Sequence, residues 1–215
     1  DTQGGAYTSW TEMTSQNQTG KVQHLLNDGE ESWESTLELS TESSHFRISP
    51  RLARCDVGNG VYAVWGEADA NQNNRGVVAQ RVDNNGLRLW GDSGTAIEPL
   101  SGHVFYDIRV ADWDDDLLVA YTRESSAGGQ EIMATRLDTS ASFRWENPFV
   151  QITNSGGDKA GLNWTGGPNC TILTWSENGS IMAHCLSEEG HLGLPLEPPG
   201  QRIHVPEDYA TIQAA

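Results

Sequence analysis

The sequence contains few basic residues and no long apolar segment. Thirteen lysines and arginines stand against 30 acidic residues, the formal net charge is −17, and Lys21 and Lys159 are the only lysines. Such a charge repels a phosphate backbone, so nucleic-acid binding is excluded. The longest uninterrupted apolar stretch, around residues 117–121, is far shorter than the roughly 20 residues that cross a bilayer. The sequence therefore predicts no membrane span.

Cysteine is also scarce. Cys55, Cys170 and Cys185 are an odd number and lack the paired spacing of a zinc site. If Asn178 and Gly179 turn a hairpin, Cys170 and Cys185 become diagonal neighbours on one sheet face, roughly 7–8 Å apart. That separation strains a disulfide unless the register slips, so we expect two buried free thiols and keep the disulfide as the alternative.

Recognisable catalytic motifs are missing as well. No Gly-x-Ser-x-Gly elbow, phosphate loop or His-Glu-x-x-His helix occurs, so we predict no catalytic residue. The densest carboxylate cluster contains Asp112, Asp114 and Asp116. Hard cations prefer several oxygen ligands, so these three residues are candidate ligands for Ca²⁺, and the sequence suggests no other cofactor. Aspartate is also a common turn former and the cluster lacks a distal glutamate, so we expect a structural turn here.

What the sequence does contain is an internal repeat. Four similar segments end at an aromatic residue, with spacings of 55, 56 and 54 residues, at Trp10, Trp65, Tyr121 and Trp175. A second column comprises Val22, Val78, Met133 and Met182, and a third comprises Trp33, Trp90 and Trp145. A fixed period of this length indicates a repeat architecture. We place the units near residues 1–44, 45–100, 101–154 and 155–203.

The apolar residues of each unit alternate or form short runs between Gly, Asn and Asp, which predicts strands. In the second unit we predict strands at 46–54, 61–67, 76–83 and 87–97. Gly86 suits the turn after the third strand, whereas the third unit has Ser140 and Ala141 there and should turn more loosely. Four antiparallel strands per unit, with large aromatic residues in the second and fourth, are typical of a β-propeller blade. A β-sandwich is the competing fold, and it does not require near-equal copies.

An acidic residue recurs two positions after the aromatic of the first column. It is present at Glu12, Glu67 and Glu177, and the third unit has Arg123 there. A general acid–base pair needs two different environments, whereas repeated positions are expected to be equivalent. We therefore predict a structural role for these acids.

The second unit also carries a family resemblance. Trp65-x-Glu67, followed by the stretch from Val78 to Trp90, resembles the repeat of uncharacterised secreted bacterial β-propellers, and the segment from Met133 to Asp138 matches too. The resemblance spans residues 1 to about 203. It implies an all-β propeller in an extracellular or cell-surface bacterial protein, and it implies no activity, because propellers carry unrelated functions.

Residues 204–215 match none of the four units. They resemble the opening of right-handed parallel β-helix domains of the pectin-lyase type, which implies a second domain starting there. The chain begins at Asp1 without a leader, so we expect it to be cut from a longer protein and its blades to form an incomplete arc.

These observations favour a non-catalytic β-propeller module of a secreted or surface bacterial protein. Its loops would bind a polysaccharide or a surface protein. The alternative is an ancillary domain of a polysaccharide lyase or glycoside hydrolase, with the active site in the downstream β-helix.

Overall fold

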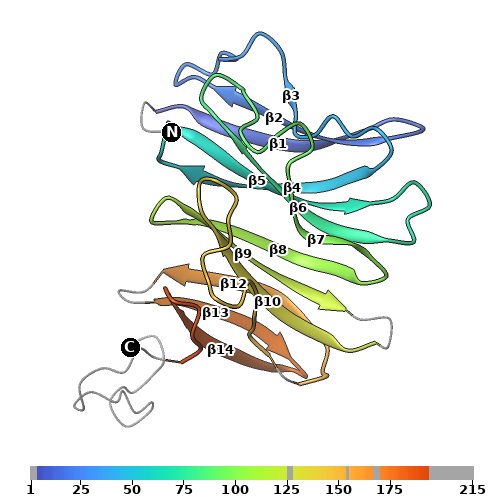
Figure 1. Cartoon of the computed structure of the whole chain (residues 1–215), viewed down its shortest axis with the longest axis vertical. Coiled ribbons are helices and arrows are strands. Elements are labelled where there is room, and N and C mark those ends of the chain that lie inside the picture. Colours follow the sequence, from blue (N-terminus) through green and yellow to red (C-terminus); the bar gives the residue numbers. More distant parts are fainter. Residues whose placement is uncertain (1–3, 125–127, 154, 167–169, 194–215) are drawn as a thin grey trace.

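The computed structural model describes residues 4–124, 128–153, 155–166 and 170–193. Their regular structure consists of β-strands, which form four antiparallel sheets stacked in sequence order (Figure 1). Among the described residues, no helix is long and apolar enough to cross a membrane. Residues 204–215, where the β-helix is predicted, lie outside the described part of the chain.

Each sheet is formed by strands that are consecutive in the chain. The first sheet contains β1 (Ala6–Met13), β2 (Gln18–Leu25) and β3 (Leu37–Glu38). The second contains β4 (Phe46–Cys55), β5 (Gly60–Ala68), β6 (Arg75–Val82) and β7 (Thr95–Ser101). The third contains β8 (Val104–Trp113), β9 (Asp116–Glu124), β10 (Gln130–Leu137) and β11 (Val150–Gln151). The fourth contains β12 (Lys159–Gly166), β13 (Cys170–Glu177) and β14 (Ser180–Ser187).

The strand register confirms the first aromatic column. The four aromatics lie opposite residues of the next strand that are themselves equivalent, in the pairs Trp10–Lys21, Trp65–Val78, Tyr121–Met133 and Trp175–Met182. The second column is wrong by one residue in the first unit, because Val22 pairs with Ser9 and Lys21 takes the expected place. Lysine at this position hid the correct alignment, since the other units have an apolar residue there.

The two terminal sheets have three described strands and the two central sheets have four. The partner of its aromatic residue shows that β1 corresponds to β5, so the described part of the first sheet contains no counterpart of β4. The fourth strand predicted for the last sheet falls on residues outside the described part of the chain.

The predicted fourth strand of the second unit starts too early. The first three strands are confirmed by β4, β5 and β6, but residues 87–97 do not form a continuous strand. Arg88 forms only an isolated bridge with Val82, and β7 begins at Thr95. Gly91 and Gly94 between them have φ angles of 76° and 78°, which an extended strand does not accommodate. The tryptophan at position 90 therefore lies in a connection rather than in a strand.

The turn of the third unit is not looser than the others. Ala141 takes a φ of 66° and donates its N–H to the Asp138 carbonyl at 3.0 Å. Gly86 makes the same bond to Asp83 at 3.1 Å. Alanine thus adopts the left-handed conformation of the glycine, at a cost of about 1–2 kcal/mol, and the turn keeps its shape.

The expectation of free thiols at Cys170 and Cys185 is wrong, because the two residues form a disulfide with a Cα–Cα distance of 5.9 Å. The register is the predicted one, with Ile172 opposite Cys185. Right-handed strand twist shortens one of the two diagonals between neighbouring strands, which the flat-sheet estimate ignored. The same diagonal of the third sheet carries Asp116 and Arg136, whose Oδ2 and Nε atoms are 2.9 Å apart.

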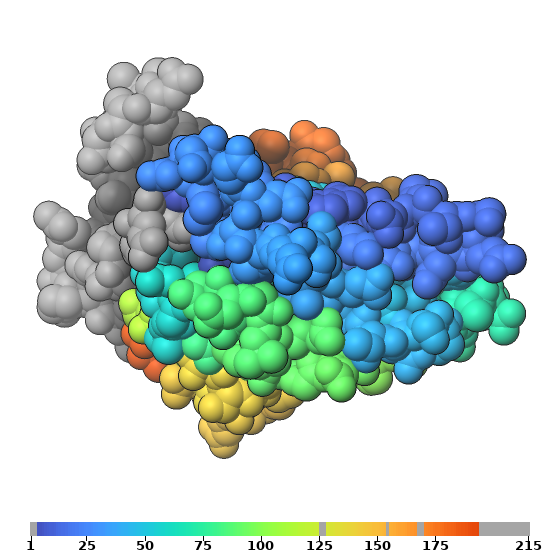
Figure 2. Space-filling view, turned by 90° about the horizontal axis from the view of Figure 1, so that it is seen from above, coloured from blue at the N-terminus to red at the C-terminus, as the bar shows by residue number. Residues whose placement is uncertain are grey.

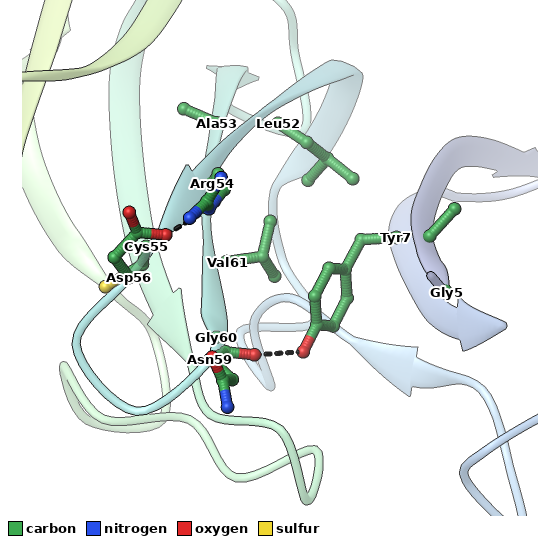
Figure 3. A pocket seen from close by; sticks show the side chains of 11 residues that line it. Gly5, Tyr7, Leu52, Ala53, Arg54, Cys55, Asp56, Asn59, Gly60 and Val61 are labelled. Atoms are coloured by element: carbon green, nitrogen blue, oxygen red, sulfur yellow. Dashed lines mark hydrogen bonds and ion pairs between the residues drawn. The ribbon is translucent and has the colours of Figure 1, made fainter. Parts of the chain in front are cut away.

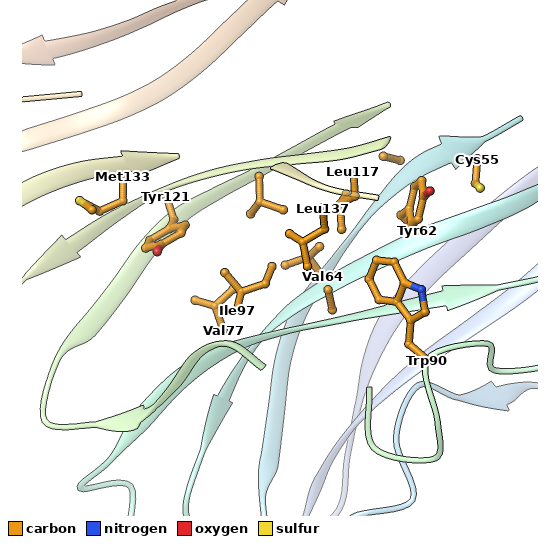
Figure 4. Close-up of a cluster of buried hydrophobic side chains, with 13 residues drawn as sticks. Cys55, Tyr62, Val64, Val77, Trp90, Ile97, Leu117, Tyr121, Met133 and Leu137 are labelled. Carbon is orange, nitrogen blue, oxygen red and sulfur yellow. The ribbon is translucent and has the colours of Figure 1, made fainter. Parts of the chain in front are cut away.

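The core consists of three clusters, one between each pair of successive sheets. We call the face of a sheet that carries the first-column aromatic its leading face, and the opposite face its trailing face. Trp65, Tyr121 and Trp175 each pack against the preceding sheet. Figure 4 shows the cluster between the second and third sheets, where Tyr121 lies near Val77 and Ile97.

A tryptophan links each pair of successive sheets at one end. The indole Nε1–H of each third-column residue donates to a turn carbonyl of the next sheet, in the pairs Trp33–Asn84 (2.9 Å), Trp90–Thr139 (2.9 Å) and Trp145–Glu188 (2.8 Å). The acceptors occupy equivalent positions, two residues after Val82, Leu137 and Leu186. The three interfaces therefore share one geometry at this end.

Candidate functional site

The predicted acidic turn joins β8 to β9, and its carboxylates have different surroundings. Asp116 is 1% exposed and accepts hydrogen bonds from Arg136 Nε at 2.9 Å and from Arg144 Nε at 2.7 Å. Two guanidinium groups therefore neutralise this carboxylate. Asp114 and Asp115 have φ angles of 52° and 67° and form the tight turn itself.

Asp112 lies at the other end of this turn. Burial raises the pKa of its carboxyl group, and the nearby charges of Asp56 and Asp115 raise it further. Among the described residues, no group of three or more His, Cys, Asp or Glu side chains is placed to hold a metal ion. Ca²⁺ binding by Asp112, Asp114 and Asp116 remains the untested alternative to the structural turn, and Asp116 already accepts hydrogen bonds from two arginines.

Each of the recurring acids lies close to a basic side chain. Glu12 lies 3.4 Å from the Lys21 ammonium group, and Glu177 lies 3.6 Å from that of Lys159. Glu67 lies 3.4 Å from Nδ1 of His45 and pairs in register with Arg47. These contacts support the predicted structural role.

The environments of these acids nevertheless differ, although repeated positions were expected to have equivalent environments. Burial raises the pKa of Glu67. Hydrogen bonds from the Ser155 hydroxyl and the Trp175 indole lower the pKa of Glu177. The two carboxylates belong to different sheet interfaces, so the contrast creates no acid–base pair.

A cavity of about 300 Å³ lies between the start of β1 and the end of β4 (Figure 3). The hydroxyl of Tyr7 donates to the Asn59 carbonyl at 2.6 Å, and Arg54 and Asp56 form an ion pair at the rim. Burial raises the pKa of Tyr7 to about 12, so its phenol stays protonated at neutral pH. Cys55 belongs to the core on the other side of β4. The cavity contains hydrogen-bonding groups and no nucleophile with an adjacent base.

The strands β4, β8 and β12 each form the edge of their sheet and each contain a β-bulge. The bulges lie at equivalent places and contain a residue with positive φ, at Ser49 (51°), Asp107 (48°) and Gly161 (66°). The Asp107 carboxylate accepts the backbone N–H of Gly161 at 2.9 Å, and Thr11 Oγ1 accepts that of Ser49 at 2.9 Å. Bulges at such edges are frequent next to functional sites.

A cleft of about 380 Å³ opens between the bulges of β4 and β8. We call it the bulge cleft and define it by Ile48, Ser49, Arg51, Arg75, Tyr106 and Asp107. Tyr106 and Ile48 are 43% and 39% exposed, and the Tyr106 hydroxyl donates to Glu124 at 2.9 Å. The cleft thus combines an accessible aromatic ring with cationic and anionic hydrogen-bonding groups, which suits binding.

The sequence pattern indicated the acidic turn but not the bulge cleft. One signal was available, because Pro50 interrupts a predicted strand and proline within a strand indicates an edge or a bulge.

No protein-family model and no curated protein matches the chain.

Proposed function

We propose that the four sheets are blades of an incomplete β-propeller arc, and that the arc is a non-catalytic binding module of a secreted or surface bacterial protein. The equivalent strand registers and the repeated indole bonds between sheets support the blade arrangement. The Cys170–Cys185 disulfide favours a location outside the cytoplasm, because disulfides persist in oxidising compartments.

The observation that carries the binding role is the bulge cleft. Tyr106 and Ile48 supply exposed apolar surface to this cleft, and the arginines Arg51 and Arg75, which carry N–H donors, line it as well. A sugar unit presents an apolar ring face and a periphery of hydroxyl groups, so it matches both parts of such a surface. We therefore propose a polysaccharide as the ligand rather than a surface protein.

Affinity electrophoresis of the whole chain through gels containing neutral or uronic-acid polysaccharides tests this proposal. We expect retardation by at least one polysaccharide and a loss of about tenfold or more in affinity for Tyr106→Ala, because an aromatic anchor dominates small binding surfaces. Phe143→Ala is the matched control, since Phe143 is 37% exposed and lies outside the cleft. Absence of retardation by any polysaccharide, or equal binding by the Tyr106 variant, would contradict the proposal.

A further inference from the structure

The register makes the bulges of β4, β8 and β12 comparable residue by residue. The last paired residue before each bulge lies opposite the residue that follows the first-column aromatic, in the pairs Ile48–Gly66, Tyr106–Thr122 and Ala160–Ser176. The residues with positive φ come next and are therefore equivalent, namely Ser49, Asp107 and Gly161. The residues at which pairing resumes are equivalent as well, namely Arg51, Arg109 and Asn163.

At the interface of the third and fourth sheets, the carboxylate of Asp107 connects the two bulges. Its Oδ2 atom accepts the backbone N–H groups of Gly161 at 2.9 Å and of Leu162 at 3.3 Å. Its Oδ1 atom lies 3.8 Å from Nη2 of Arg109 in its own sheet. Hydrogen bonds to an ionised acceptor are stronger than those between neutral groups. The bulge of β12 therefore binds a carboxylate, which the chain itself supplies.

The interface of the second and third sheets has no such carboxylate. Ser49 takes the place of Asp107, and within the described ranges its hydroxyl group makes no hydrogen bond to the bulge of β8. The bulge cleft lies at this place, since both residues line it together with Ile108. Figure 2 looks down the stack from the side of the first sheet, and the two sheets that border the cleft follow behind it.

The backbone N–H of Asp107 is a donor for this cleft. The bulge N–H of β4 donates to Thr11 of the first sheet, and that of β12 donates to Asp107 of the third sheet. In both cases the acceptor belongs to the preceding sheet. We therefore expect the equivalent N–H of β8 to face the second sheet, where the cleft opens.

Two arginines of the cleft lack an anionic partner. Arg51 is the equivalent of Arg109, and Arg75 lines the cleft from β6. Neither guanidinium group has a hydrogen bond or an ion pair with another residue of the described part of the chain, whereas Arg109 has Asp107. The chain contains 30 acidic and only 13 basic residues. Two unpaired arginines in one cleft of such a chain indicate that their partner is a ligand.

The carboxylates around the cleft are engaged in other contacts. Glu67 lines the cleft, lies 3.4 Å from Nδ1 of His45, and has a pKa that burial raises. The carboxylate of Asp107 accepts the N–H groups at the next interface. Glu124 accepts the hydroxyl group of Tyr106 at 2.9 Å. The unpaired charges that line the cleft are therefore positive.

We propose that the bulge cleft binds the carboxylate of an acidic sugar unit, so that the ligand is a polyuronate rather than a neutral polysaccharide. The ligand carboxylate accepts the Asp107 N–H and lies beside Arg51 and Arg75, as the Asp107 carboxylate does at the next interface with its own partners. Ile48 and Tyr106 contact the sugar ring. This inference rests on the proposed polysaccharide-binding function.

Affinity electrophoresis of the whole chain compares acidic polymers with their neutral forms. The probes are alginate and polygalacturonate, and the same polymers after reduction of their carboxyl groups to alcohols. We expect at least one acidic polymer to retard the chain, and its reduced form to bind about tenfold or more weakly, since hydrogen bonds to a charged group are lost. Arg51→Gln should weaken binding of the acidic polymer by a similar factor. Arg54→Gln is the matched control, because Arg54 is exposed and lies outside the cleft.

Ser49→Asp supplies the missing carboxylate from the chain itself. Aspartate tolerates positive φ, and its carboxylate then reaches the Asp107 N–H and Arg51. Relative to Ser49→Ala, which leaves the cleft open, we expect about tenfold or more weaker binding of the acidic polymer and a melting temperature about 2–4 °C higher. The same pair in an Arg51→Gln background controls for the φ preference of aspartate, because the rise should then shrink.

Equal affinity for an acidic polymer and its reduced form, or an unchanged affinity of Arg51→Gln, would overturn this inference and leave polysaccharide binding intact. Absence of retardation by any polymer would overturn the proposed function and the sugar ligand with it. Competition by acetate as strong as that by the free uronate monomer would show a site for small carboxylates instead of a sugar. A Ser49→Asp chain that melts below Ser49→Ala would show that no carboxylate fits at this position.

Discussion

Trp65 and Trp10 occupy the same place in the repeat but differ in their exposure to solvent. Trp10 in β1 lies opposite Lys21, and Trp65 in β5 lies opposite the equivalent residue, Val78. Trp65 is nevertheless fully buried, whereas Trp10 is 38% exposed. The difference comes from the neighbouring sheet, since the first sheet covers Trp65 and no described sheet covers Trp10. A repeat thus specifies the contact surface, and the presence of a neighbour decides whether that surface becomes core.

We expect the largest loss of stability from substituting Trp65, the buried residue of this pair. Trp65→Ala removes a fully buried indole from the core between the first and second sheets, which costs about 3–5 kcal/mol of unfolding free energy. Trp10→Ala removes a partly exposed ring and should cost less than about 1.5 kcal/mol. Urea unfolding followed by far-UV circular dichroism measures both. Similar losses for the two variants would contradict the assignment of Trp10 to an open face.

The next effect concerns the acidic turn at the interface of the third and fourth sheets. Asp116→Ala leaves the buried Arg136 guanidinium without its carboxylate, which should cost about 3 kcal/mol. Asp114→Ala removes an exposed carboxylate from the same turn and should cost about 1 kcal/mol, mainly through its positive φ. The two midpoints in urea give the comparison. A calcium-dependent rise in melting temperature that both substitutions abolish would instead establish the metal site.

We expect a smaller difference in stability between substitutions of Gly86, which lies against the Trp33 ring, and of Gly29, which has no described neighbour within 4 Å of its Cβ position. Gly86→Ala and Gly29→Ala both place a side chain at positive φ, which alone costs about 1–2 kcal/mol. At Gly86 the new Cβ also meets the Trp33 ring, so we expect about 1 kcal/mol of additional loss there. Thermal unfolding of the two variants should therefore give a lower midpoint for the Gly86 substitution. Equal midpoints would show that the Trp33 ring yields without cost.

The smallest expected effect is a pH dependence of stability that has opposite directions for Glu177 and Glu67. Glu177 has a lowered pKa in the folded state, so its contribution to stability is present above the unfolded pKa of about 4.3 and is lost as the pH falls through the folded value. Glu67 has a raised pKa, so its ionisation weakens folding as the pH rises from the unfolded to the folded value.

The measurement is the unfolding free energy of Glu177→Gln and Glu67→Gln between pH 3 and pH 7. The loss caused by Glu177→Gln should grow as the pH rises from about 4, where unpaired glutamates ionise. Glu67→Gln should gain stability relative to the wild type over the same interval. Parallel curves for the two variants would contradict the opposite directions of their pKa shifts.

Much of the fold could be predicted from the sequence because it depends on local patterning. Alternating apolar residues between turn formers predicted β4, β5 and β6 and the antiparallel pairing of neighbouring strands. The aromatic column predicted which side chains are equivalent. Lys21 hid a shift of one residue in the first unit, since the second column was aligned on apolar character alone.

The remaining features depend on three-dimensional geometry that a linear pattern does not encode. Strand twist brings Cys170 within bonding distance of Cys185, and the tertiary fit of the turn holds Ala141 at positive φ. The partners of Asp116 lie 20 and 28 residues away on the chain, so the sequence showed only a cluster of acids. The bulge cleft requires two edge strands to lie side by side, which Pro50 alone could not predict.

Hydrogen exchange of the indole Nε1–H groups tests the central claim that one interface is repeated between successive sheets. Two-dimensional NMR resolves these protons, and single Trp→Phe variants assign them. We predict slow exchange for Trp33, Trp90 and Trp145, because each donates to a turn carbonyl of the next sheet, and fast exchange for the exposed Trp10. Exchange of any of those three indoles as fast as that of Trp10 would contradict the repeated interface.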